Sequence, residues 1–330
     1  MARRRGAVFA AAALGCVISA LLSLCLGAAA LSPAQLWRAA LSGPNDTAGY
    51  IFWFSRLPRT CAGLFSGAAL SCAGCVMQAV LGNKLASPSV VGVNAGAGLG
   101  VTLCCAAGLL SGWAVAGASF AGALAAAGGV VLLARRTGAS RTTVILSGVA
   151  LNSILNALRD AVTLLSPEAA MLSGEFRVGG FSAVTSTRLF PAAALIALAL
   201  AAVMTLGNDL DVLALGEETA ASLGMRVRRK RAVFLLLAAL LAGAAVSFSG
   251  LLGFVGLLVP HMARRFVGAQ SRFALPLSAL MGAGFVTLCD LAARLLFAPY
   301  ELPVGILMAV LGGPFFLTLL FREKGGHRNA

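Results

Sequence analysis

The side chains best suited to catalysis or metal binding are few in this sequence of 330 residues. Cys72 and Cys75 form a C-x-x-C pair, but a zinc site needs four converging ligands and no second pair accompanies this one. His261, one of two histidines, follows Pro260 without a carboxylate nearby in the sequence, which favours a structural hydrogen bond over proton transfer. A convergent acid–base set is also missing. The sequence therefore predicts no metal site, no cofactor in this chain and no enzyme activity.

The most strongly charged segment, residues 207–231, has a different character. It holds four of the chain's eleven acids, followed by five bases, with apolar residues between them. It is long enough to fold as helices outside a membrane, and its length and mixed composition count against a simple solvated connector. The chain has no G-x-x-x-x-G-K-[ST] phosphate loop, so we expect any ATP-driven work to come from another protein.

Long apolar stretches must position these residues. Hydrophobic residues make up 59% of the chain, charged residues 11%, and the mean hydropathy is +0.94, which exceeds what one soluble core would bury. About 20 apolar residues let a helix cross the hydrocarbon layer, and runs near that length predict about ten spans. The spans are 7–28, 57–80, 90–108, 113–134, 143–165, 189–206, 231–249, 251–267, 274–297 and 303–321.

Two of these spans need comment. The first follows three arginines, as in a secretory signal, but its apolar run is longer than a signal allows, so we interpret it as a membrane helix. The division near residues 248–250 is weak, and the seventh and eighth spans also fit one broken segment. Before the second span, residues 29–56 contain Trp37 and Trp53, which predicts an outer loop with a short interfacial helix.

The basic residues favour one orientation, because Lys and Arg accumulate on the cytoplasmic side of a membrane. With the amino terminus inside, 18 of the 25 basic residues fall on that side. They are Arg3, Arg4, Arg5, Lys84, Arg135, Arg136, Arg141, Arg226, Arg228, Arg229, Lys230, Arg231, Arg264, Arg265, Arg272, Arg322, Lys324 and Arg328. The pattern predicts an even number of spans and two cytoplasmic termini. It also argues against nucleic-acid binding, because the Lys and Arg residues lie in short clusters with few aromatic residues on which nucleobases could stack.

Several short blocks, in a fixed order, carry a resemblance to a known family. They are Arg56-Leu57-Pro58-Arg59, Asn83-Lys84-Leu85-Ala86-Ser87-Pro88, and the segments 92–97, 147–150, 215–224, 253–265, 301–306 and 312–316. The chain closely resembles the permease family that imports iron siderophores, haem and cobalamin with ATP-binding cassette partners. The match runs from about residue 56 to the carboxyl terminus. Lys84 departs from it, since the family usually has proline there.

The resemblance implies an architecture and a set of partners. It implies one all-α, polytopic permease domain over residues 1–330, with inverted repeats of spans 2–5 and 7–10, in the inner (cytoplasmic) membrane. Two copies would form a homodimer with the translocation path between them, although a heterodimer with a related permease stays open. Two cytoplasmic ATP-binding subunits, which bind ATP and magnesium, would drive alternating access, and a periplasmic or lipoprotein substrate-binding protein would deliver the cargo. Ferric siderophore, haem and cobalamin all remain possible substrates.

The resemblance also assigns roles to individual residues. In the family an inner loop forms two short helices that sit in a groove of the ATPase, and we call the corresponding residues 207–231 the coupling loop. The residues that match the coupling motif are Leu215, Gly216, Glu217, Glu218, Thr219, Ala220, Leu223 and Gly224. The apolar members, Leu215, Ala220 and Leu223, are expected to contact the ATPase. The two glycines are expected to permit the turns at either end.

Two further sets come from the same resemblance. Arg56, Arg59 and Arg294 match outer arginines that receive carboxylates of the binding protein, since a guanidinium can hold a carboxylate bidentately. For Arg294 an ion pair with Asp290, four residues earlier, is an alternative. The residues that match the cytoplasmic gate are Asn83, Leu85, Thr142 and Thr143. Helix capping and turn formation are equally good roles for each of these four.

Other polar residues leave alternatives open. Four amides either line the path or tie helices together, namely Gln78, Asn94, Asn152 and Asn156. An ion-coupled secondary transporter is the rival interpretation, and it requires carboxylates inside the spans. Only Asp160 and Asp290 fit that requirement, and each has an arginine close by in the sequence.

Overall fold

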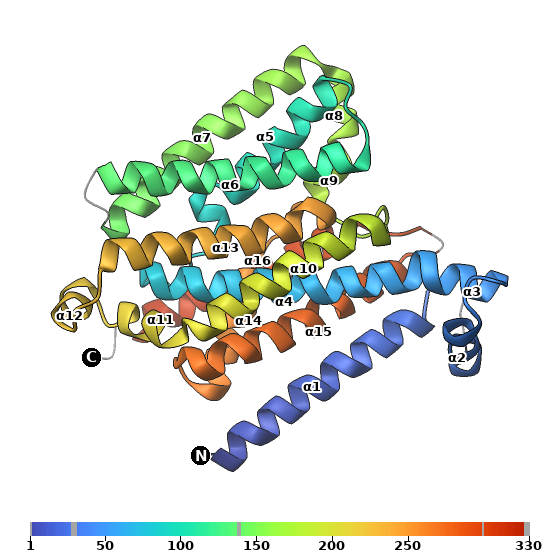
Figure 1. Ribbon diagram of the computed structural model, residues 1–330, viewed down its shortest axis with the longest axis horizontal. Helices are drawn as coiled ribbons and strands as arrows, with labels where there is room; N and C mark the ends of the chain where they lie inside the picture. The colour runs from blue at the N-terminus through green and yellow to red at the C-terminus, as the bar shows by residue number, and fades with distance from the viewer. Residues whose placement is uncertain (1, 28–31, 137–139, 299, 327–330) are drawn as a thin grey trace.

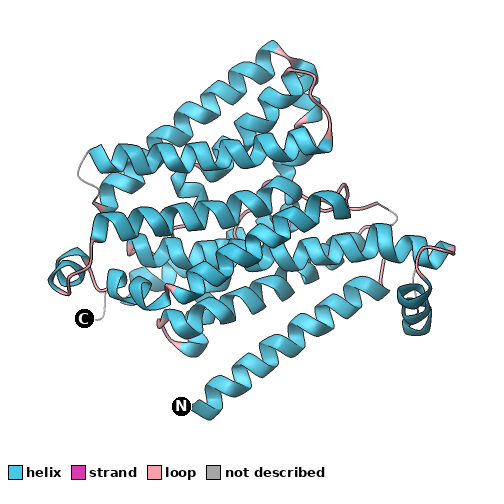
Figure 2. Ribbon diagram, in the orientation of Figure 1, coloured by secondary structure: helices cyan, strands magenta, loops and turns pink. Residues whose placement is uncertain are grey.

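The computed structural model describes the chain except for residues 1, 28–31, 137–139, 299 and 327–330. Every regular element in the described part is a helix (Figures 1 and 2). In chain order they are α1 (Ala2–Cys25), α2 (Pro33–Ser42), α3 (Thr47–Ile51), η1 (Phe52–Arg56), α4 (Leu57–Leu81), η2 (Pro88–Val91), α5 (Val93–Ala106), α6 (Gly112–Arg136), α7 (Arg141–Leu165), α8 (Pro167–Leu172), α9 (Gly174–Val178), α10 (Ser186–Thr205), α11 (Gly207–Ala214), α12 (Glu217–Ser222), α13 (Val227–Ser249), α14 (Val255–Val267), α15 (Ser271–Leu295) and α16 (Val304–Gly326). The fold is all-α, as the sequence predicts. Some of the sequence predictions lie outside the described residues: residue 28 of the first span, residues 29–31 of the outer loop, and Arg328 among the cytoplasmic bases.

Each of the ten expected spans coincides with a helix. Six segments of the described chain are long and apolar enough to cross a membrane: Arg4–Cys25, Thr47–Leu81, Gly112–Ala134, Ser186–Thr205, Val227–Ser249 and Ser271–Leu295. The helices α5 and α14 have 14 and 13 residues, or about 20 Å of length, which is less than the hydrocarbon layer of about 30 Å. The helix α7 is long enough but carries Arg159 and Asp160. By length and composition alone, six crossings are supported.

The helix α4 forms the centre of the bundle, where it packs against α13, α14 and α15 (Figure 1). Most of its side chains are buried. Glycine makes this packing possible, because a Cβ on Gly74 would collide with the carbonyl oxygen of Gly256 on α14, and one on Gly67 with that of Gly282 on α15. Small residues let helices approach closely in lipid, where no hydrophobic force drives them together. The glycines of α4 therefore fix how closely the core helices pack.

The weak division between the seventh and eighth spans is a break between two helices. The helix α13 ends at Ser249 and α14 begins at Val255, four residues later than the sequence predicts. Between them the backbone N–H of Leu251 donates to the carbonyl of Phe176 over 2.9 Å, and the N–H of Gly180 donates to the carbonyl of Ser249 over 2.8 Å. Irregular backbone is tolerated inside a membrane where other protein groups satisfy it. These hydrogen bonds keep the short irregular connection stable.

The outer loop contains the short helix that the sequence predicts. The helix α2 begins with a capping box, in which Ser32 and Gln35 bond each other's backbone. Trp37 on α2 is exposed, whereas the indole N–H of Trp53 donates to the carbonyl of Ala39 over 3.0 Å. An interfacial location for α2 stays a prediction, supported by its exposed tryptophan.

The two ends of the bundle carry different elements. Figure 1 shows α11, α12 and the start of α7 at one end, and α2, α3, α8 and α9 at the other. The sequence assigns the first group to the cytoplasmic side and the second to the outer side. Segments with the same assignment therefore lie at the same end of the molecule.

Candidate functional site

The coupling loop folds as two short helices, α11 and α12, in agreement with the prediction from its length. Gly216 precedes α12 with φ 117° and Gly224 follows it with φ 82°. Residues with a side chain rarely adopt these angles, so both turns depend on glycine. The N–H of Met225 donates to the carbonyl of Ala220 over 3.0 Å, which closes the end of α12. The predicted turn roles of both glycines are confirmed.

The coupling loop exposes a mixed apolar and acidic surface. Leu215 and Leu223 are each 64% exposed, and Glu218 and Thr219 are also exposed. Ala220 corrects one prediction, because its side chain is fully buried and has no surface left for a partner. Its methyl group instead lies on the inner face of α12. The apolar contact surface therefore consists of the two leucines.

Two ion pairs and a hydrogen bond attach α11 and α12 to α13 and α15. Arg231 of α13 is 2% exposed and pairs with Glu217 at 2.7 Å. Lys230 pairs with Asp209. The carboxylate of Asp211 accepts the N–H of Ser271 over 2.8 Å and so caps the start of α15. The helix α12 is thus fixed to α13, and α11 is fixed to both α13 and α15.

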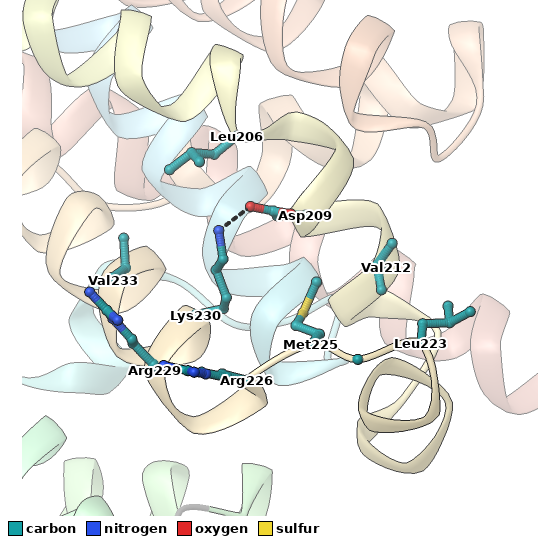
Figure 3. Close-up of a pocket in the computed structure, with 10 residues that line it drawn as sticks. Leu206, Asp209, Val212, Leu223, Met225, Arg226, Arg229, Lys230 and Val233 are labelled. Carbon is teal, nitrogen blue, oxygen red and sulfur yellow. Dashed lines mark hydrogen bonds and ion pairs between the residues drawn. The ribbon is translucent and has the colours of Figure 1, made fainter.

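A groove of about 720 Å³ lies between α11, the end of α12 and the start of α13 (Figure 3). Its lining residues are Leu206, Asp209, Val212, Leu223, Gly224, Met225, Arg226, Arg229, Lys230 and Val233. Figure 3 shows the Lys230–Asp209 pair near the middle of the groove, with Arg226 and Arg229 along one side and Leu223 and Met225 on the other. A lining that combines apolar side chains with three cationic residues and one acid suits a partner that is both apolar and acidic.

The predicted gate residues have local structural contacts. At the end of α4, the side-chain oxygen of Asn83 accepts the N–H of Leu85 over 2.8 Å, which shapes residues 82–85, here called the gate turn. At the start of α7, Ser140 caps the helix through the N–H of Thr143 over 3.1 Å and lies 2.8 Å from its hydroxyl. Thr142 is exposed. Turn formation by Asn83 and capping at Thr143 are confirmed, whereas the gate role of all four stays a prediction.

The outer arginines converge on two carboxylates, and we call Arg56, Arg59, Asp290, Arg294 and Glu301 the arginine cluster. The guanidinium of Arg59 bonds Asp290 over 3.0–3.1 Å through Nε and Nη2, and bonds Glu301 over 2.7 Å through Nη1. Arg294 pairs with Asp290 at 3.2 Å and also bonds the hydroxyl of Ser23 on α1 over 2.9 Å. The Asp290 side chain is 3% exposed. One buried carboxylate thus pairs with two guanidinium groups.

The cluster refines the predicted docking set. Arg56 and Arg294 are each 5% exposed, and both donate to the carbonyl of Leu26 at the end of α1. The i,i+4 ion pair between Arg294 and Asp290, weighed as the alternative role, is confirmed. The side chains of Arg59 and Glu301 are 12% and 40% exposed, so this pair is the outward-facing part of the cluster. Docking stays a prediction, and its strongest candidate is Arg59.

Sequence reasoning missed Glu301 as a partner of Arg59. The two residues are 242 positions apart, and no periodicity connects them. The block that contains Glu301 was recognised only as a family motif. Spacing alone found the Arg294–Asp290 pair because those residues lie on one helix.

Several other polar side chains form hydrogen bonds between helices. The amide of Gln78 donates to the carbonyl of Gly256 over 3.2 Å, and that of Asn152 donates to the carbonyl of Ser89 over 2.8 Å. Both therefore tie helices, one of the two roles expected for them. Cys75 accepts a hydrogen bond from Arg264 over 3.5 Å.

The side chain of Asp160 is 64% exposed and pairs with Arg159 at 2.9 Å. Both candidate carboxylates of the rival interpretation are thus held by arginines.

Comparisons with known proteins agree with this architecture. The model of the FecCD transport family matches residues 15–322. The chain is 35% identical to the hemin transport system permease protein of Yersinia pestis, over 93% of both chains, and 37% identical to the cobalamin import system permease protein of Halobacterium salinarum, over 84% of this chain and 75% of the other. A solved inward-facing metal-chelate type ABC transporter aligns with TM-score 0.86 and 28% identity, over 96% of this chain and 99% of the other. The all-helical bundle, its apolar helices and these matches together place the chain in the FecCD transport family of multi-pass ABC transporter permeases.

Proposed function

We propose that this chain is the membrane-spanning permease subunit of an ATP-driven importer for an iron complex, either a ferric siderophore or haem, or for cobalamin. The observation that carries the proposal is the coupling loop, which presents two exposed leucines, each directly before a positive-φ glycine, at one end of the bundle. A chain that lacks a phosphate loop needs such a surface to receive work from an ATPase. Relatives named as hemin and cobalamin permeases support the cargo class.

In the proposed topology the chain crosses the inner membrane ten times, and both of its termini lie in the cytoplasm. Spans 2–5 and 7–10 form inverted repeats, as the resemblance implies. The coincidence of ten helices with ten expected spans and the bias of basic residues support this topology. The short helices α5 and α14 then cross only part of the layer and are continued by irregular backbone.

Two copies of the chain form the translocation path between them in this proposal. The helix α7 supports it, because it exposes large apolar side chains along its length that include Leu146, Val149, Ile154 and Leu158. The same helix begins with the predicted gate residues Thr142 and Thr143. A second copy packed against α7 would cover apolar side chains and enclose a path lined by this helix.

The proposed mechanism separates the two ends of the bundle. At the outer end, a carboxylate of the substrate-binding protein approaches Arg59, which already presents a guanidinium held in place by Asp290. At the inner end, two ATP-binding subunits seat α12 and move the coupling loop when they bind and hydrolyse ATP. The gate turn and the start of α7 then open or close, which gives alternating access to the path.

Reconstitution tests the proposal directly. The chain is placed in proteoliposomes with its ATP-binding subunits and with a binding protein loaded with ferric siderophore, haem or cyanocobalamin in separate trials. We expect ATP-dependent uptake of one of the three. Uptake that persists without ATP and collapses with the proton gradient would instead establish an ion-coupled transporter, although the arginine pairs of Asp160 and Asp290 count against that mechanism.

A further inference from the structure

Arg141, the first residue of α7, joins two regions that the proposed mechanism treats separately. Its Nη2 donates to the carbonyl oxygen of Leu213 in the last turn of α11 over 3.0 Å. Its guanidinium also lies against the gate turn, because a Cβ added to Gly82 would be 2.5 Å from Nη1 and 3.0 Å from Cζ. One side chain therefore contacts the coupling loop, the end of α4 and, through its own backbone, the start of α7.

Both contacts of Arg141 are with well-fixed backbone. Leu213 is fully buried, and its carbonyl lies at the negative end of α11, which attracts a cation. Gly82 ends α4 with φ 59°, and its N–H bonds the carbonyl of Ala79 over 3.3 Å. Neither backbone group can move without its helix. A displacement of α11 therefore moves the carbonyl oxygen to which the guanidinium is bonded.

The surroundings of Arg141 favour this contact over solvent. The residue is only partly exposed, and its Nε is buried without a hydrogen-bond partner among the described residues. A charge-assisted hydrogen bond is stronger where water is excluded. An unsatisfied buried donor also leaves one bond available for a different arrangement of the same elements. The site thus suits a side chain that stays hydrogen-bonded while the helices shift.

The other contacts of the coupling loop lead elsewhere. Glu217 pairs with Arg231 of α13, Asp209 pairs with Lys230 of α13, and Asp211 caps α15. These contacts attach the loop to the bundle core. Arg141 instead connects α11 to the segments that carry Asn83, Leu85, Thr142 and Thr143.

We infer that Arg141 is a positioning residue that makes the gate turn and the start of α7 follow the coupling loop. The inference rests on the proposed function, since it needs an ATPase that moves the loop. It adds the connection through which that movement reaches the gate. It also gives a reason for glycine at position 82 beyond its backbone angle, because a side chain there would displace the guanidinium.

The test uses a reporter at the gate, so the cargo need not be known. Leu85→Cys is labelled with a membrane-impermeant maleimide in the complex with the ATP-binding subunits, with and without ATP, and labelling of the parent chain is subtracted. We expect ATP to change the labelling rate at position 85. In Arg141→Ala, ATPase attachment and hydrolysis should persist while the ATP-dependent change falls about tenfold, the worth of one hydrogen bond to a charged group.

Arg136→Ala is the matched control. It removes an exposed arginine at the end of α6, close in sequence to Arg141. Its response to ATP should equal that of the parent. An equal loss in both variants, or a full response in Arg141→Ala, would overturn the inference.

A second variant, Gly82→Asn, keeps every charge in place and tests the same inference if Arg141→Ala does not fold. Asparagine tolerates the left-handed conformation of Gly82, so Gly82→Asn mainly displaces the guanidinium. We expect the same loss of the ATP response, with no further loss when both substitutions are combined. A normal response in Gly82→Asn contradicts the inference. A parent complex that binds no ATPase contradicts the proposed function instead, so the two failures are distinguishable.

Discussion

At the scale of single residues, the arginine cluster shows how one carboxylate organises several cations. Asp290 is buried and pairs with both Arg59 and Arg294, which come from α4 and α15. Glu301 takes the remaining outward donor of Arg59. The cluster therefore has an inner structural pair and an outer pair that is accessible to a partner.

Asp290→Asn should destabilise the fold strongly. The substitution removes the buried charge that pairs with both Arg59 and Arg294, and breaking a buried ion pair costs about 3–5 kcal/mol. The free energy of unfolding of the purified chain in detergent measures the effect. Asp160→Asn is the control, because its exposed pair with Arg159 contributes no more than about 1 kcal/mol. Equal losses in the two variants would show that the Asp290 network is not structural.

Glu301→Gln should strengthen capture of the loaded binding protein. The glutamine keeps an acceptor oxygen but carries no charge, so it competes more weakly for Nη1 of Arg59 and a partner carboxylate gains access to that donor. We expect affinity for the chain in nanodiscs to rise a few-fold at low salt and the gain to shrink at high salt. Arg59→Gln should weaken capture at least about tenfold.

The control for this pair of variants is Glu175→Gln. Glu175 lies in the same outer hollow as Glu301 but accepts a hydrogen bond from Ser182 over 2.8 Å. Its substitution should leave affinity unchanged. Capture that is insensitive to Arg59→Gln would remove Arg59 from the docking surface.

How well the sequence predicts residue roles depends on sequence distance. The Arg294–Asp290 pair follows from helical spacing, and the turn roles of Gly216 and Gly224 follow from glycine's conformational freedom. Arg141 gave no such signal, because it looks like any cytoplasmic base until α11 is placed beside it. Ala220 was assigned to the contact surface because apolar content alone does not reveal which face of a short helix is buried.

At the scale of the elements, helix packing is set by glycine. The apolar runs predict where helices lie but not how deeply they are buried. Both α1 and α4 are apolar, yet 11% of the most apolar window of α1 is buried, against 78% for the span that contains α4. Hydropathy does not distinguish lipid from protein as a neighbour, since both are apolar. The sequence predicts a break near residues 248–250, but it does not predict that the irregular backbone extends to residue 254, because those residues are as apolar as the helices beside them.

Gly74→Ala should disrupt the packing of α4 against α14. The new Cβ would collide with the carbonyl oxygen of Gly256, which is backbone and has no rotamer to escape into. Overpacking of this kind costs about 1–3 kcal/mol or more. Gly128→Ala in α6 is the control, because a Cβ there has no neighbouring atom within 4 Å and alanine favours the helix by up to about 1 kcal/mol. Thermal unfolding compares the two, and equal midpoints would contradict the packing argument.

At the scale of the whole molecule, the two ends divide the proposed work. One end, the outer one in the proposed topology, holds the arginine cluster, and the opposite end holds the coupling loop, the gate turn and the start of α7 (Figure 1). The rigid core around α4 lies between them. The sequence predicted this division through the bias of basic residues, because charge sorting follows the membrane and not the tertiary contacts.

The most direct measurement of the central claim concerns the two exposed leucines of the coupling loop. The double variant Leu215→Asp and Leu223→Asp is compared with Leu41→Asp, which alters a leucine on α2 at the opposite end that is 72% exposed, against 64% for the other two. For each variant we would measure how much ATP-binding subunit is retained on purification and how fast ATP drives uptake in proteoliposomes. We predict that the double variant loses both activities, because charged groups replace its apolar contact, while Leu41→Asp retains the ATPase. Full retention and full uptake in the double variant would contradict the account.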